Sequence, residues 1–144
     1  MEDSFTGIVD VGSKPIIARE AVATGVLRLS TESLDIVKNG RSVKGDVREA
    51  STVAAIQAVK ETPRLLPHCH PIPIEGCTVD WSVADEFLRC TVSVRTHWTT
   101  GVEMEALTAV SVAALTLYDM CKAVDKSMVI GNIKLVQKTK TALV

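Results

Sequence analysis

Two of the chain's three histidines flank a cysteine in the segment 66–73, whose prolines stiffen the backbone. On an extended chain alternate side chains point the same way, so His68 and His70 would share one side and Cys69 would face the other. Such a pair could transfer protons, contact a phosphate group, or bind zinc with Cys77 as a third ligand. Because no carboxylate follows closely enough to complete a metal shell, acid–base or phosphate-contact chemistry is favoured. Two histidines hydrogen-bonded within a loop are the simpler alternative.

A second candidate site lies at Lys44, which is followed by Gly45 and Asp46. Aspartate is a good N-cap residue, so a helix is predicted to begin directly after Asp46. The N–H groups at a helix start attract anions, the lysine adds positive charge, and Gly45 would let a ligand approach closely. The same three residues also form an ordinary turn and cap, so the signal is weak by itself. The chain contains no G-x-x-x-x-G-K-[ST] phosphate-binding pattern.

A long apolar segment, residues 102–124, carries ionisable residues at both ends. Its hydrophobic residues recur at spacings of three and four, as on the buried face of a helix: Leu107, Val110, Ala114, Leu117 and Cys121. Glu105, Asp119 and Lys122 are predicted to lie off that face. A helix rises about 1.5 Å per residue, so Glu105 and Asp119 would be about 21 Å apart. Either a long ligand lies along this helix, or its two ends serve different sites, as when identical subunits complete one another's pockets.

Asp119 and Lys122 are three positions apart and would share one side of this helix. An exposed ion pair of this kind contributes on the order of a few tenths of a kcal/mol. The apolar residues before it favour instead a partly desolvated pair, in which a lysine can exchange protons near neutral pH. Two arginines, Arg19 and Arg95, are either surface charges or phosphate clamps, and their spacing does not decide between these roles.

Length and charge limit the classes of function. A chain of 144 residues with 47% hydrophobic residues has the size of one compact domain, and we expect a single domain over residues 1–144 with an irregular arm at 1–15. The formal net charge of −1 gives no overall attraction to nucleic acid or to an anionic membrane. With two Trp, one Tyr and two Phe, the chain also lacks the aromatic residues of a base-stacking surface.

The sequence favours a soluble cytoplasmic protein. Its amino terminus is acidic and is not followed by an apolar run, which argues against a secretory signal. The longest stretch low in charge, residues 106–118, is too short to span a bilayer. The four cysteines form no C-x-x-C pair, and Cys77, Cys90 and Cys121 are expected to be reduced and mostly buried.

The hydrophobic periodicity predicts an order of strand, two helices, hairpin, helix and strand. The strands are expected at residues 18–30, 77–83, 88–94 and 129–138. The first helix would follow a cap at Ser30 or Thr31 and end at Gly40, the second would run from Asp46 to Pro63, and the third would begin at Val102. This order favours an α+β, ferredoxin-like fold, an antiparallel or mixed sheet with its helices packed on one face.

Five blocks of the chain closely resemble the MoaC family, the cyclic pyranopterin monophosphate synthases of molybdenum cofactor biosynthesis. They are residues 9–15, 44–47, 67–71, 100–108 and 118–124, and they follow the family's order over nearly the whole chain. The resemblance implies a lyase that converts (8S)-3',8-cyclo-7,8-dihydroguanosine 5'-triphosphate, a small molecule derived from GTP, to cyclic pyranopterin monophosphate and diphosphate. It also implies a ferredoxin-like homohexamer, a trimer of dimers with pockets at subunit interfaces.

The resemblance implies catalytic roles for Lys44, His70, Asp119 and Lys122. Asp119 and Lys122 would form the proton-transfer pair, and His70 would be a second acid or base. Lys44 would stabilise negative charge as the cyclic phosphate forms and diphosphate leaves. No metal ligand and no cofactor is implied, and whether Mg²⁺ accompanies the phosphates is left open.

The implied substrate contacts are Arg19, His68, Cys69, His70, Met104 and Glu105. Arg19 and His68 would help to neutralise the triphosphate, and Glu105 would hold the N–H donors of the guanine-derived ring. The chain departs from the family pattern at its end, where residues 138–144 replace a G-G-K-S-G stretch, and at Trp98 and Thr99, where many members have Gly-Lys.

Two other functions are considered. A metal-dependent hydrolase would use His68, His70 and Cys77 as ligands. A non-catalytic oligomeric binding module would present the same polar groups at the solvated edges of its interfaces.

Overall fold

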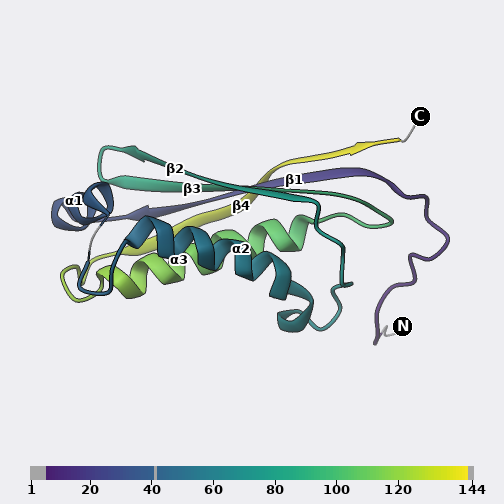
Figure 1. Cartoon of the computed structure of the whole chain (residues 1–144), viewed down its shortest axis with the longest axis horizontal. Helices are drawn as coiled ribbons and strands as arrows, with labels where there is room; N and C mark the ends of the chain where they lie inside the picture. Colours follow the sequence, from purple (N-terminus) through teal and green to yellow (C-terminus); the bar gives the residue numbers. More distant parts are fainter. Residues whose placement is uncertain (1–5, 41, 143–144) are drawn as a thin grey trace, which may run out of the picture.

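The computed structural model describes residues 6–40 and 42–142, which are organised around an antiparallel sheet of four strands. The strands are β1 (Ile17–Arg28), β2 (Gly76–Ala84), β3 (Phe87–Trp98) and β4 (Val129–Thr141), in the order β2-β3-β1-β4. The helices are α1 (Thr31–Asn39), α2 (Val47–Leu65) and α3 (Glu103–Cys121). Figure 1 shows α2 and α3 against one face of the sheet and α1 beside the turn between β2 and β3. This β-α-β-β-α-β arrangement confirms the predicted α+β, ferredoxin-like fold.

The hairpin of β2 and β3 has the period of two that its sequence predicts. In β3 the side chains of Leu88, Cys90, Val92 and Val94 are fully buried, whereas Arg89 and its alternate neighbours lie on the opposite face. The two strands are joined at Asp85 and Glu86, and Asp85 has a φ of 55°, a left-handed conformation that aspartate tolerates. One face of the hairpin is therefore shielded from solvent and packs on the helices.

Small residues in β1 allow α3 to approach the sheet closely. Ala21 and Ala23 are fully buried beneath the helices. At Gly25 there is no room for a side chain, because an added Cβ would lie 2.5 Å from Cγ1 of Val110 in α3. The position of α3 therefore depends on the absence of side-chain atoms at this point of β1.

The predicted helix caps explain how the chain passes from β1 to α2. Strand β1 ends at Arg28, two residues earlier than expected, because Ser30 turns the chain into α1 and its hydroxyl accepts the backbone N–H of Ser33. Gly40 ends α1 in the left-handed conformation, with a φ of 78°. Asp46 then caps α2 by accepting the N–H of Glu49.

The predicted end of α2 at Pro63 is wrong, because the helix continues to Leu65. Proline removes one N–H donor, and so close to the end of the helix only one backbone hydrogen bond is lost. The Thr62 hydroxyl donates to the carbonyl of Ala58, and the N–H of Leu66 still bonds the carbonyl of Thr62. The last turn is therefore retained around the proline.

Helix α3 is apolar on more than its buried face. Val110, Ala114, Leu117 and Cys121 are fully buried, as predicted, and Leu107 is partly buried. The opposite side carries Leu115, which is 60% exposed. By length and composition α3 is the one helix among residues 6–40 and 42–142 that could cross a membrane, but half of its apolar segment is buried inside the fold.

Replacing Gly25 with Ala should destabilise the fold, because the new methyl group would overlap Val110 and push α3 from the sheet. We expect a loss of about 1–3 kcal/mol in the free energy of unfolding, measured by urea denaturation. The matched control is Gly131→Ala in β4, where an added Cβ meets no atom within 4 Å. Equal effects of the two substitutions would contradict the close approach of α3 to β1.

Candidate functional site

Two lysines meet one aspartate at the carboxyl end of α3. The Nζ atom of Lys44 lies 2.9 Å from Oδ2 of Asp119, and Nζ of Lys122 lies 3.0 Å from Oδ1 of the same carboxylate. Lys44 stands on a tight turn closed by two backbone hydrogen bonds between Ser42 and Gly45, and the φ of 111° at Gly45 is one that glycine adopts without strain. We call Lys44, Asp119 and Lys122 the lysine–aspartate cluster.

The lysine–aspartate cluster is exposed in the single chain. Its side chains are 47%, 52% and 58% accessible for Lys44, Asp119 and Lys122, so the prediction of a partly desolvated pair is wrong for the isolated chain. The reason is that α3 ends here, with Lys122 as its C-cap. Hydrogen bonds from Lys44 and then Lys122 hold the pKa of Asp119 below its usual value. Two ammonium groups on one carboxylate leave a surplus positive charge that suits an anionic ligand.

Asp125, which the sequence interpretation missed, fixes the surroundings of this cluster. Its carboxylate is 2% exposed and accepts the backbone N–H of Ser30 at 2.8 Å and both the N–H and the hydroxyl of Ser127. Burial opposes ionisation, but these donated hydrogen bonds outweigh it and lower the pKa of Asp125. Asp125 thus ties the segment after α3 to the start of α1. The spacing of Asp125 and Ser127, an Asp-x-Ser pattern, was the sequence signal that could have predicted this carboxylate's hydrogen bonds to a residue two positions on.

At the amino end of α3 a carboxyl group is buried beside a thiol. Glu105 is 1% exposed, and the prediction that it lies away from the buried side of the helix is wrong. The thiol of Cys69 donates to Oε2 of Glu105 at 3.7 Å, whereas Oε1 has no hydrogen-bond partner among the described residues. Burial raises the pKa of Glu105. Burial, followed by the charge of Glu105, raises the pKa of Cys69 to about 11.

An unpartnered buried carboxyl oxygen is unusual in a folded protein and often marks a place where a ligand binds. A neutral carboxyl group at Glu105 could donate one hydrogen bond and accept another. It could therefore recognise a ring edge that carries both donors and acceptors. This chemistry differs from that of the lysine–aspartate cluster, which suits phosphate.

The two histidines point away from this buried pair, as the alternation predicts. Nδ1 of His68 hydrogen-bonds the carbonyl of Gly7, and Nε2 of His70 lies 2.6 Å from the carbonyl of Val9, while Cys69 faces Glu105. In the single chain the histidines therefore have the simpler arrangement considered above, hydrogen bonds within a loop region.

The described residues contain no cluster of three or more histidine, cysteine, aspartate or glutamate side chains that could hold a metal ion. Cys77, the third ligand of the zinc site considered as an alternative, lies in β2 opposite Val94 of β3. Within the part of the chain that the structure describes, the cysteines are free thiols, and Cys90 and Cys121 are buried as predicted. The arrangement gives no support to the metal-dependent hydrolase.

Positively charged side chains of β1 and β4 lie near the amino end of α3. Arg19 is 7% exposed and donates to the carbonyls of Trp98 and Thr99, at 3.1 and 3.3 Å, in the segment that leads into α3. In β4, Lys140 lies directly opposite Arg19 in the strand register, and Nζ of Lys138 is 3.7 Å from Oε1 of Glu103. Neither lysine was predicted to contribute to a site.

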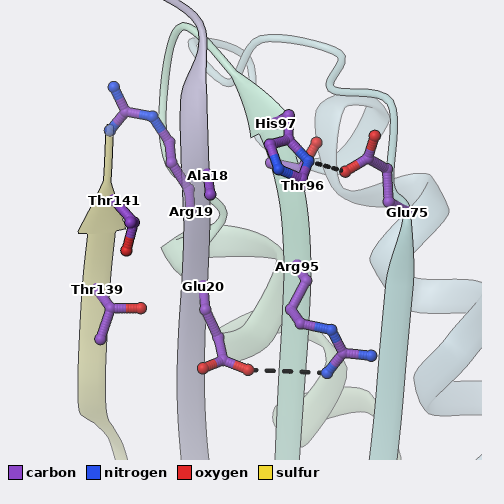
Figure 2. Close-up of a pocket in the computed structure, with 9 residues that line it drawn as sticks. All are labelled: Ala18, Arg19, Glu20, Glu75, Arg95, Thr96, His97, Thr139 and Thr141. Carbon is purple, nitrogen blue, oxygen red and sulfur yellow. Dashed lines mark hydrogen bonds and ion pairs between the residues drawn. The ribbon is translucent and has the colours of Figure 1, made fainter. Parts of the chain in front are cut away.

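A hollow of about 230 Å³ lies on the sheet face opposite α2 and α3. Figure 2 shows Arg95 paired with Glu20, and His97 paired with Glu75, across neighbouring strands. The first pair is 3.7 Å apart and the second 2.6 Å. Because Arg95 is matched by a carboxylate here, its predicted alternative role as a phosphate clamp gains no support. Figure 2 also shows Arg19 directed toward the end of β4.

The predicted site residues therefore form two groups rather than one. His68, Cys69, His70, Glu105, Arg19 and the 43%-exposed Met104 lie toward the amino end of α3. Lys44, Asp119 and Lys122 lie at its carboxyl end. The two groups are separated by most of the length of a 19-residue helix.

Comparisons with known proteins agree with the blocks seen in the sequence. A sequence model of the MoaC family matches residues 8–141. A cyclic pyranopterin monophosphate synthase of Clostridium perfringens is 50% identical over 133 residues, covering 91% of this chain and 84% of the relative. Synthases of the same name from Novosphingobium aromaticivorans and Peptoclostridium acidaminophilum are 47% and 45% identical, covering 91% and 96% of this chain and 83% and 88% of the relatives.

Replacing Glu105 with Gln should leave the fold at least as stable as the wild type at neutral pH. The raised pKa means that the folded state keeps this proton at pH values where the unfolded chain has released it, so stability falls as the pH rises through that window. The difference in the free energy of unfolding between Glu105→Gln and the wild type should shrink as the pH falls toward the usual glutamate pKa of about 4.3. Urea unfolding between about pH 4 and pH 8 measures this difference. A variant markedly less stable than wild type at neutral pH would mean that the carboxylate is a structural partner.

Proposed function

The chain belongs to the MoaC family, and we propose that it converts (8S)-3',8-cyclo-7,8-dihydroguanosine 5'-triphosphate to cyclic pyranopterin monophosphate and diphosphate. This is the lyase step of molybdenum cofactor biosynthesis that the resemblance implied. The observation that carries the proposal is the lysine–aspartate cluster within a chain that is 45–50% identical to named synthases over nearly all of its length. The hydrolase and the non-catalytic module have no comparable support.

The proposed phosphate chemistry belongs to the lysine–aspartate cluster. Closing the cyclic phosphate forms one P–O bond to a hydroxyl oxygen of the substrate and breaks the bond to the departing diphosphate. Lys122 and Asp119 would accept and return protons, and Lys44 would neutralise the charge that builds on the phosphate oxygens. These roles need no desolvation of the cluster in the free chain, because a bound substrate would itself exclude water.

The ring chemistry belongs to the opposite end of α3. Glu105 would hold the N–H donors of the guanine-derived ring, with Cys69 and Met104 against it. His70 would act as a second acid or base, and Arg19 and His68 would contact the triphosphate. The buried, unpartnered oxygen of Glu105 supports this assignment, because a substrate N–H would give it the partner it lacks.

We further propose that each complete site is shared between two copies of the chain. Glu105 and Asp119 are about 21 Å apart along α3, too far for one compact substrate to contact both in the same chain. Packing a second α3 antiparallel to the first would bring the Glu105 end of one copy to the Asp119 end of the other. The exposed apolar side of α3, which includes Leu115, supports such packing. The proposed assembly is a homohexamer, a trimer of dimers.

The proposed reaction needs no resident cofactor. We propose that the enzyme is soluble and cytoplasmic. The conversion rearranges the substrate and releases diphosphate, so it requires proton transfer and charge neutralisation rather than electron transfer. Whether Mg²⁺ accompanies the phosphates is decided by measuring diphosphate release with and without a chelator.

Lys122→Ala should abolish turnover without unfolding the protein. We expect diphosphate release from the cyclised dihydro-GTP to fall by about 10²–10⁴-fold, the usual contribution of a positioned acid or base. The melting temperature should change little, because an exposed ion pair contributes little to stability. The control is Lys60→Ala, an exposed lysine on α2 that belongs to neither group. If the wild type released no diphosphate at any enzyme concentration, the non-catalytic module would be the better account.

Mixing two inactive variants should restore activity if sites are shared. Glu105→Gln and Lys122→Ala, unfolded together and refolded at equal concentrations, would form assemblies in which about one site in four combines the intact ends of two different chains. We therefore expect about a quarter of the wild-type rate per site. Each variant refolded alone is the control. No recovery from mixed assemblies, shown by differential tags to contain both chains, would mean that each site lies within one chain.

A further inference from the structure

The amino-terminal arm, residues 6–16, runs beside the histidine segment in a fixed register. The carbonyl of Gly7 meets His68 and the carbonyl of Val9 meets His70, and both contacts join residues that are 61 positions apart. The two segments therefore run parallel and keep the same register over two contacts. In each contact an imidazole nitrogen hydrogen-bonds a backbone carbonyl.

Backbone carbonyls decide which nitrogen of each imidazole carries the proton. A carbonyl oxygen can only accept, so the ring nitrogen that faces it must be an N–H donor. His68 faces the arm with Nδ1 and His70 with Nε2. In the neutral rings the proton-accepting nitrogens are therefore Nε2 of His68 and Nδ1 of His70, and the two histidines are opposite tautomers.

We propose that the arm is a positioning element that selects these tautomers and so fixes the ring nitrogen that each histidine presents to the substrate. This inference rests on the proposed function, in which both histidines belong to the substrate site. It assigns Nδ1 of His70 as the atom that acts as acid or base. It also assigns a role to backbone atoms of the arm, which contact the histidines rather than the substrate.

The histidine segment is held firmly enough for this selection. Prolines 67 and 71 flank it, and on its far side the Thr96 hydroxyl donates to the carbonyl of Pro73 and the N–H of Glu75 donates to the carbonyl of Arg95. These contacts tie the residues that follow the histidines to β3. The arm contacts the two imidazoles themselves, so the segment is anchored at two places along its length.

The arm is shaped by its own hydrogen bonds. The carboxylate of Asp10 accepts the N–H of Gly12 at 2.8 Å, and the N–H of Lys14 donates to the carbonyl of Val11. The side chains of Ile8 and Val9 are 51% and 60% exposed in the single chain. Backbone hydrogen bonds to the histidines, rather than burial of apolar side chains, therefore attach this part of the arm to the chain.

The first test reads the tautomers directly in the full-length protein. Correlation of ring ¹⁵N and ¹H signals at a pH where the rings are neutral distinguishes the protonated nitrogen from the bare one. The chain has three histidines, and His97, whose Nδ1 faces Glu75 across the sheet, is an internal reference away from the arm. We expect the Nδ1–H form for His68 and the Nε2–H form for His70. The Nε2–H form at His68, or the Nδ1–H form at His70, would overturn the inference.

The second test removes the two carbonyls. A chain that starts at Asp10 after a new methionine lacks Gly7 and Val9, and the matched control lacks only residues 1–5. The longer deletion should allow His68 to change tautomer and should lower kcat by roughly 10–100-fold, as misplacement of a catalytic group does, with KM changed less than about threefold. The control should keep both values, and His97 should be unchanged in both chains.

The outcomes separate this inference from the proposed function. If the full-length chain forms no diphosphate, the proposed function fails whatever the tautomers are. If the full-length chain is active but the longer deletion retains its kcat, the arm does not position the histidines and the inference is wrong. A deletion that lowers kcat while both tautomers persist would also overturn it, because the loss would then have another cause.

Discussion

The rigid length of α3 is the constraint on which the rest of the molecule depends. The helix packs on β1 where Gly25 leaves room for Val110 of α3. Its first turn carries Glu105 and its last turn carries Asp119, about 21 Å away. Because a helix cannot bend its two ends together, one chain presents two separate chemical groups. The shared site that we propose follows from this separation.

The two ends of α3 differ in their access to water, and this difference suits two kinds of ligand chemistry. At the amino end burial keeps Glu105 and the Cys69 thiol toward their protonated forms, which favours directional hydrogen bonds. At the carboxyl end two lysines share the Asp119 carboxylate in contact with solvent, and their hydrogen bonds keep Asp119 in its charged form by lowering its pKa. A substrate with a heterocycle at one end and phosphates at the other needs both environments.

Segments without regular secondary structure position the remaining groups, because they are anchored on two sides. The histidine segment is tied to β3 through Thr96 and meets the arm through its imidazoles. The turn that carries Lys44 is closed by backbone hydrogen bonds, and the segment after α3 is anchored to α1 through Asp125. Loops that bear function on a rigid scaffold are usual in enzymes, and here the sheet and α3 form the scaffold.

The sequence by itself determined the order of the elements, the caps at Ser30, Gly40 and Asp46, the alternation of the hairpin, and the opposite directions of His68 and Cys69. These features depend on residues two to four positions apart, so local rules predict them. Only the tertiary structure decided that Glu105 is buried and that the lysine–aspartate cluster is exposed. It also brought Gly7 and Val9 to histidines 61 positions away. Burial and such pairings depend on which distant segment covers a given side chain, and no spacing within one helix or strand encodes that.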